Sequence, residues 1–104
     1  MKKLQLPIEF HAYQIALLYA DEQQIKNVLG DPHYVETDST RTCGGHEALW
    51  AYEVNGEPFA INCRIPYEES VIYTRNPKPI DVFEAIKQLF PAVKLEIYDE
   101  PHKI

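Results

Sequence analysis

The sequence predicts an α+β fold in which an antiparallel sheet of about four to six strands carries two short helices packed on one face. Two segments have helix-capping and helix-stop residues, an Asn55-Gly56 pair separates two strand-like runs, and eight prolines divide the remainder into short pieces. A chain of 104 residues is of ordinary domain size and buries enough apolar surface for a core without disulfides or metals. We therefore expect a single domain over residues 1–104.

The N-terminal quarter offers two strand candidates. Residues 4–8 are a possible edge strand, limited by Pro7, which cannot donate a backbone hydrogen bond. Residues 13–19 are mostly apolar and suit a strand or an extended lead-in, although their alanine and leucines would also accept a helix.

A helix is predicted to begin after Asp21. Asp at the N-cap with Gln24 three residues later forms a capping box, which satisfies backbone N–H groups that otherwise lack partners. Apolar residues then recur at helical spacing, and a glycine and a proline stop the helix. These residues are Ile25, Val28 and Leu29 for the stripe, and Gly30 and Pro32 for the stop.

The Asn55-Gly56 pair predicts a tight hairpin between strands at residues 48–54 and 58–65, because both residues accept the positive φ angles of a type I′ turn. Alternation places Trp50, Tyr52 and Val54 on one face of the first strand; on the second strand Phe59, Ile61 and Cys63 share a face opposite to Ala60, Asn62 and Arg64. For Trp50 this pattern favours the core beneath a helix over an interface. Residues 33–38 are a further strand candidate, and residues 39–45 read as a loop.

The C-terminal third repeats the alternation of strand and helix. Residues 71–75 are rich in strand formers, and Asp81 is expected to cap a second helix with Glu84 at the matching capping-box position. The buried stripe of this helix is Val82, Phe83, Ile86, Leu89 and Phe90, and Pro91 ends it. Residues 94–98 are predicted as a last strand and residues 99–104 as a polar tail.

Charge limits the classes of partner. Sixteen acidic and ten basic residues give a net charge of −6, which repels nucleic acid and anionic lipid and speeds encounter with basic molecules. No apolar stretch has the length of a signal peptide or a membrane span. We therefore expect a cytoplasmic protein that binds neither nucleic acid nor membrane directly.

Sequence motifs give little support to catalysis. Cys43 is followed closely by His46, and an imidazole can activate a thiol, but no third residue is clearly placed to orient the pair. Cys43, His46 and Cys63 match no familiar zinc spacing, and no glycine-rich phosphate loop is present. We predict no catalytic residues, metal or cofactor, and expect reduced thiols in preference to a Cys43–Cys63 disulfide.

Aromatic residues favour binding. Seven tyrosines, four phenylalanines and one tryptophan exceed the needs of one small core, and tyrosine is enriched at protein interfaces. Tyrosines beside acidic residues are the best candidates for contact with a basic protein. The predicted partner-binding residues are Tyr34, Glu36, Asp38, Tyr67, Glu68, Glu69, Tyr73, Asp99 and Glu100.

Residues 20–32 and the Leu49-Trp50-Ala51-Tyr52 run together resemble the BamE (SmpA/OmlA) lipoproteins and the related β-lactamase-inhibitor-protein fold. The shared features are a capped helix, a Leu-Gly-x-Pro stop and a Trp-x-Tyr strand leading into antiparallel sheet, over about half of the chain. This resemblance implies a binding scaffold without catalysis. The chain departs from the lipoproteins at its N-terminus, which reads neither as a leader nor as an acylated cysteine.

In composition the chain also resembles the immunity proteins of bacterial toxin systems, which are small, acidic and rich in aromatic residues. The leading hypothesis is therefore an inhibitor, such as an immunity protein, that neutralises a basic nuclease-type toxin by direct binding. Two alternatives stay open: a small thiol-dependent enzyme using Cys43 and His46, and a homodimeric scaffold joined through a sheet edge.

Overall fold

Seven strands and two helices make up the computed structural model, which describes residues 2–4, 13–36, 46–65 and 69–103. The elements follow the chain in the order β1 (Lys2–Lys3), β2 (Tyr13–Leu18), α1 (Glu22–Leu29), β3 (Tyr34–Glu36), β4 (His46–Val54), β5 (Glu57–Ile65), β6 (Ser70–Thr74), α2 (Ile80–Leu89) and β7 (Leu95–Lys103). The ambiguous run at residues 13–19 is therefore a strand.

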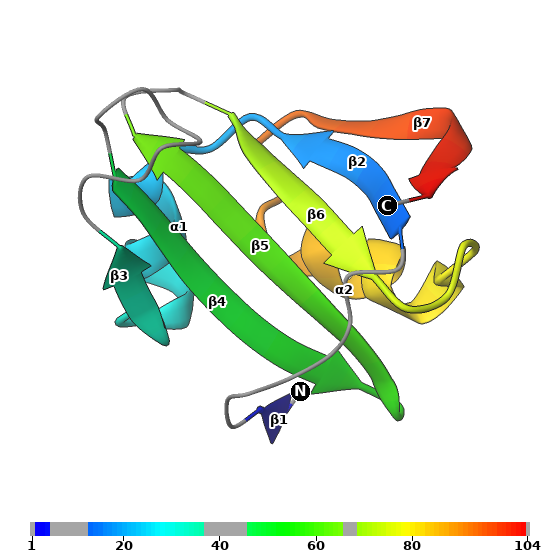
Figure 1. The fold of residues 1–104 in the computed structure, drawn as a ribbon, viewed down its shortest axis with the longest axis horizontal. Coiled ribbons are helices and arrows are strands. Elements are labelled where there is room, and N and C mark those ends of the chain that lie inside the picture. The colour runs from blue at the N-terminus through cyan, green and yellow to red at the C-terminus, as the bar shows by residue number, and fades with distance from the viewer. Residues whose placement is uncertain (1, 5–12, 37–45, 66–68, 104) are drawn as a thin grey trace.

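All strands belong to one antiparallel sheet with the spatial order β1-β4-β5-β6-β2-β7 (Figure 1). Six strands form this path, the upper end of the expected number, and β3 adds a seventh by pairing with the same edge of β4 as β1. The α+β prediction is confirmed. The sheet places β2, near the start of the chain, between β6 and β7, so its order could not be read from the sequence.

The central hairpin is confirmed residue by residue. Val54 pairs with Glu57 across the turn, and Asn55 and Gly56 take φ angles of 50° and 80°, as a type I′ turn requires. This turn fixes the register of β4 against β5. Trp50 therefore lies opposite Ile61, and Tyr52 lies opposite Phe59.

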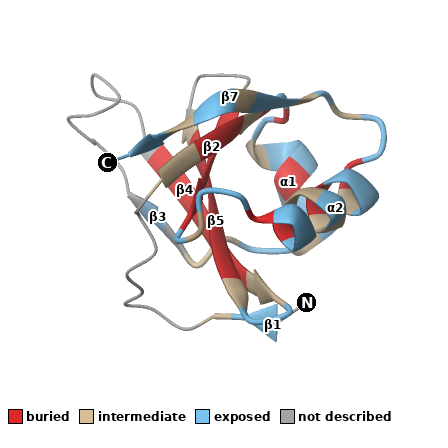
Figure 2. Ribbon diagram, turned by 90° about the vertical axis from the view of Figure 1, so that its right-hand side faces the viewer, coloured by how far each residue is buried: buried red, intermediate tan, exposed pale blue. Residues whose placement is uncertain are grey.

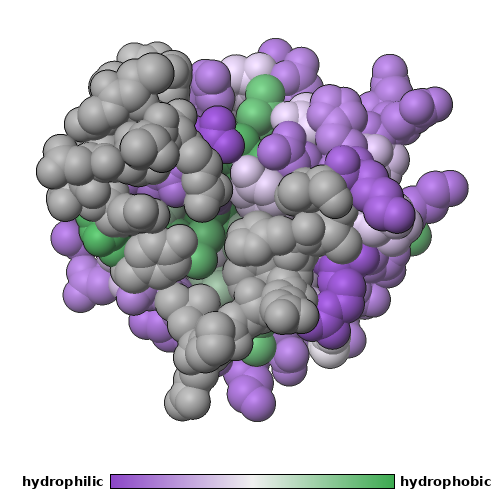
Figure 3. Space-filling model, viewed as in Figure 1, coloured by the Kyte–Doolittle hydropathy of each residue, from purple (hydrophilic) through white to green (hydrophobic). Residues whose placement is uncertain are grey.

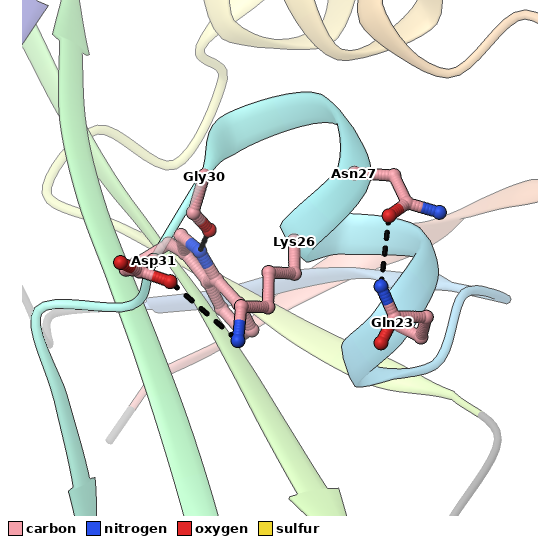
Figure 4. A network of polar contacts seen from close by, with 6 residues as sticks. Gln23, Lys26, Asn27, Gly30 and Asp31 are labelled. Atoms are coloured by element: carbon pink, nitrogen blue, oxygen red, sulfur yellow. Dashed lines mark hydrogen bonds and ion pairs between the residues drawn. The ribbon is translucent and has the colours of Figure 1, made fainter.

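The first helix begins and ends as predicted. The Asp21 side chain accepts from the Gln24 backbone N–H at 2.9 Å, and the Gln24 side chain accepts from the Asp21 N–H, also at 2.9 Å. At the C-terminus, the Gly30 carbonyl accepts a hydrogen bond of 3.0 Å from the Trp50 indole N–H, and an ion pair of 3.5 Å joins Lys26 to Asp31 (Figure 4). The sheet thus satisfies a carbonyl that the end of the helix leaves unpaired.

Both helices contribute to one core on the same face of the sheet (Figure 2). Ile25 from α1 and Val82 and Ile86 from α2 are fully buried there, together with Trp50 and Phe59 from the sheet. Trp50 is therefore a core residue, as the alternation predicts. Val28 is a correction, because it is 41% exposed: α1 is short, and only its Ile25 side is fully buried against the sheet.

The second helix starts differently from the prediction. It begins at Ile80 with Pro79 at the N-cap, and no side chain forms the cap, so Asp81 lies within the first turn. Proline supplies a fixed φ near the helical value and needs no N–H partner, which makes it a workable start. The buried stripe of α2 is as predicted, with Phe83 and Leu89 packed at the margin of the core.

The C-terminal strand is longer than predicted. The polar residues 99–103 continue β7 instead of forming a tail, because Tyr13 and Gln14 of β2 pair with Lys103 and His102. Backbone pairing at a sheet edge does not require apolar side chains, so these residues show no periodic pattern typical of a strand. Between Ile97 and His102 the register shifts at a bulge, which changes the direction of the strand.

At the other edge, Lys2 and Lys3 pair with β4, and the Leu4 N–H donates to the Ala51 carbonyl at 3.1 Å. The rest of the strand predicted at residues 4–8 lies outside the described residues. Neither helix in the described part of the chain is long and apolar enough to cross a membrane.

Candidate binding face

The sheet face opposite the helices, here called the outer face, carries the polar groups of interest. Figure 1 views the molecule from this side, with both helices behind the sheet. Leu49, Ala51, Ala60 and Tyr73 form a small second apolar cluster on it. In Figure 3, seen from the same direction, hydrophilic residues predominate where Figure 1 places β2 and β7.

A chain of polar contacts crosses the outer face over four adjacent strands. The Arg64 Nε lies 3.9 Å from the Glu47 Oε1, and the Arg64 Nη2 donates to the Tyr73 hydroxyl at 3.5 Å. The Gln14 Nε2 donates to the same hydroxyl at 3.3 Å. We call Glu47, Arg64, Tyr73 and Gln14 the polar band.

The end of the band at β4 is incompletely satisfied. Glu47 is only 1% exposed, yet neither carboxylate oxygen has a hydrogen-bond partner among the residues that the structure describes. The Oδ1 of Asn62, a residue 4% exposed, and the Nε of Arg64 lack one as well. Buried polar groups normally find partners, so these atoms call for an explanation.

The other end of the band meets β7. The rings of Tyr98 and His102 stack with their centroids 4.5 Å apart. Burial raises the pKa of the Tyr98 hydroxyl, the charges of Glu96 and Tyr73 raise it further, and Arg64 opposes them. In register, Gln14 of the polar band pairs with His102 of β7, and the Tyr98 ring stacks on that histidine, so the band continues to β7.

An open hollow of about 750 Å³ lies along β7. Its lining is acidic and aromatic and consists of Glu96, Ile97, Tyr98, Asp99, Glu100 and His102. Glu96 accepts a hydrogen bond of 2.7 Å from the Tyr19 hydroxyl, which is the main cause of the raised pKa of Tyr19. The Lys94 ammonium lies 5.0 Å from the centre of the Tyr19 ring. The hollow therefore exposes carboxylates beside aromatic rings at a sheet edge.

Two groups of predicted partner-binding residues can be placed by their strands. Asp99 and Glu100 were expected in a polar tail but are exposed residues of β7 in the lining of the hollow. Tyr34 and Glu36 belong to β3, in register with Leu49 and Glu47. Glu69 is half-buried just before β6. Asp38, Tyr67 and Glu68 lie outside the described residues.

Tyr73 is a correction, because the sequence interpretation expected an exposed anchor and the residue is only 4% exposed. It pairs with Ala60 of β5 and belongs to the same cluster as Ala51. These small neighbours leave room for a ring to lie on the sheet, with its hydroxyl held by Gln14 and Arg64.

The prediction missed Glu47, Arg64, Gln14 and His102. One signal was present: alternation already placed Arg64 and Asn62 on the face opposite to Phe59 and Ile61. The remaining contacts depend on the sheet order, since Gln14 and Tyr73 are 59 positions apart in the chain.

Of the residues considered for thiol or metal chemistry from the sequence, the structure describes only Cys63 in full. Cys63 is a free, buried thiol, and burial raises its pKa, which lowers its reactivity at neutral pH. Cys43 lies outside the described residues, and His46 is the first residue of β4. Within the described ranges, no three histidine, cysteine, aspartate or glutamate residues converge as a metal site would need.

Comparison with protein-family models, with curated proteins and with solved structures finds no match. The resemblance to the BamE lipoproteins therefore stays a prediction.

Proposed function

We propose that this protein is a non-catalytic inhibitor that binds a basic protein, in the manner of an immunity protein that neutralises a nuclease-type toxin. The observation that carries the proposal is the exposed acidic lining of the β7 hollow. Glu96, Asp99 and Glu100 lie there beside Tyr98 on an outer strand of the sheet. A basic surface would meet carboxylates and an aromatic ring together.

The whole-chain charge supports the same proposal. A net charge of −6 attracts a basic partner over distances up to the Debye length, about 8 Å at physiological salt. Charges of this kind act mainly on the association rate, whereas desolvated contacts at the centre of an interface set the residence time. The acids at β7 would steer the partner, and Tyr98 on His102 would offer it a stacked aromatic surface.

Tyr34 and Glu36, both proposed from the sequence, lie on β3 at the other edge. The same edge of β4 also pairs with Lys2 and Lys3 of β1, so its residues are of mixed charge. The proposal therefore centres on the acidic β7 edge of the outer face and on the polar band beside it.

The decisive experiment is a pull-down followed by calorimetry with the product of the adjacent gene, because toxins and their antidotes are usually encoded side by side. We expect a 1:1 complex with a dissociation constant below about 1 μM, which corresponds to about −8 kcal/mol. If no neighbouring gene product binds at that strength, the inhibitor proposal is wrong. A stable homodimer in light scattering would instead support the scaffold alternative.

Matched charge reversals test the role of β7. The double variant Asp99→Lys/Glu100→Lys should slow association about tenfold or more at low salt. The control Asp31→Lys/Glu84→Lys makes the same change in net charge at exposed sites on the helix side. Equal slowing by both variants would show that overall charge matters and that β7 has no special role.

A further inference from the structure

Glu47 presents two acceptor atoms that the described residues leave unused. It is almost completely buried, and neither oxygen has a hydrogen-bond partner in the described part of the chain. Asn62, also buried, adds a third acceptor without a partner, and it belongs to the β5 strand that pairs with β4. Burying a carboxylate without donors is costly, so an arrangement of this kind fits a site that receives donors from elsewhere.

Arg64, the cation paired in register with Glu47, does not saturate the carboxylate. Its Nε stays 3.9 Å away, beyond hydrogen-bond distance. Its Nη2 is directed instead to the Tyr73 hydroxyl. The Arg64 side chain is 32% exposed, whereas Glu47 and Asn62 are buried, so an incoming group would reach their oxygens by displacing the Arg64 side chain.

The strand register adds a charge argument. Glu36 of β3 pairs with Glu47 of β4, which pairs with Arg64 of β5. The row across the three strands therefore holds two acidic residues and one basic residue. By residue type and register alone, the row carries a net charge of −1, which a second cation would balance.

We propose that Glu47 and Asn62 form a recognition site for the guanidinium of an arginine side chain supplied by the basic partner. Guanidinium offers five N–H donors in a planar fork that matches a carboxylate in two-point contact, whereas an ammonium is a compact point charge. Three unused oxygen acceptors favour the group with several fixed donors. This inference rests on the proposed function and identifies the chemical group by which the protein would recognise its partner.

The test titrates the full chain with agmatine, a guanidinium probe, and with cadaverine, an ammonium probe of similar length, and follows backbone amide NMR signals. Agmatine should produce saturable shifts at Glu47, Asn62 and Arg64, with an affinity about tenfold or more above that of cadaverine. No saturable shift at these residues, or equal affinity for both probes, would overturn the assignment. This measurement requires no variant and no partner.

The isosteric variant Glu47→Gln should weaken agmatine binding about tenfold or more. The control Glu84→Gln, at an exposed acidic residue of α2 on the helix side, should leave it unchanged. Unchanged affinity in Glu47→Gln would mean that Glu47 has only a structural role.

Arg64→Met gives a second readout, because removing the competing guanidinium should strengthen agmatine binding, an effect that a structural ion pair would not produce. Weaker or unchanged binding in a folded Arg64→Met protein would contradict the proposal. If agmatine does not bind but the pull-down yields a tight complex, this inference is wrong and the proposed function stands. If agmatine binds but no protein partner is found, the proposed function is wrong and the guanidinium site stands.

Discussion

At the scale of single residues, the tyrosines show how the same side chain takes different roles. Tyr52 lies on the helix face, where its hydroxyl donates to the Leu29 carbonyl at 2.9 Å and its ring lies 6.4 Å from that of Phe59. Tyr73 lies on the outer face within the polar band. The sequence predicted the face of Tyr52 from alternation, but it did not predict the burial of Tyr73, which depends on neighbours far away in the chain.

The burial of Tyr52 predicts that the free energy of unfolding falls at alkaline pH. Burial raises its pKa above the ordinary value of 10.0, so the folded state holds this proton more tightly than the unfolded state does. The resulting stability is complete below pH 10 and is lost as the pH rises through the folded pKa. In urea unfolding between pH 7 and 11, the wild type should therefore weaken more steeply above pH 10 than Tyr52→Phe.

At pH 7 the same substitution should cost about 1 kcal/mol, because it removes the hydrogen bond to Leu29 while keeping the ring. Parallel alkaline declines in the two proteins would show that another group causes the effect.

At the scale of elements, the two helix starts provide a matched pair. Both Asp21 and Asp81 look like N-caps in the sequence, but only Asp21 has the capping bonds. Asp21→Ala should lower the free energy of unfolding by about 1 kcal/mol. Asp81→Ala removes no cap and should cost less than about 0.5 kcal/mol, from the lost interaction of its charge with the helix N-terminus. Urea unfolding at neutral pH measures both, and equal losses would contradict the assigned caps.

These elements also show what could be predicted. The α1 cap, the Asn55-Gly56 turn and the faces of β4 and β5 depend on residues within a few positions of one another, and all were predicted correctly. The extension of β7 through Asp99 and Glu100 depends on its pairing with β2, some 85 positions earlier in the chain, a distance over which local patterns carry no signal.

At the scale of the whole molecule, the candidate site follows from the sheet order. Gln14, Tyr73 and His102 come from three separate parts of the chain and lie in one row only because β2 lies between β6 and β7. The sequence could predict the composition of the face but not this arrangement. The prediction combined acidic residues with Tyr34, Tyr67 and Tyr73, whereas the β7 hollow combines Asp99 and Glu100 with Tyr98.

The shared core makes a final prediction about cooperativity. Ile25 of α1, Ile86 of α2 and Trp50 of β4 belong to one buried cluster, so neither helix should separate from the sheet without exposing the tryptophan. Trp50, the single tryptophan, is fully buried and reports on this core. Its fluorescence and the far-UV circular dichroism should therefore change in one coincident urea transition, as expected for a small two-state domain. If the helical signal disappears before the fluorescence changes, a helix unfolds independently of the core. That result would contradict the single packed core that supports the outer face.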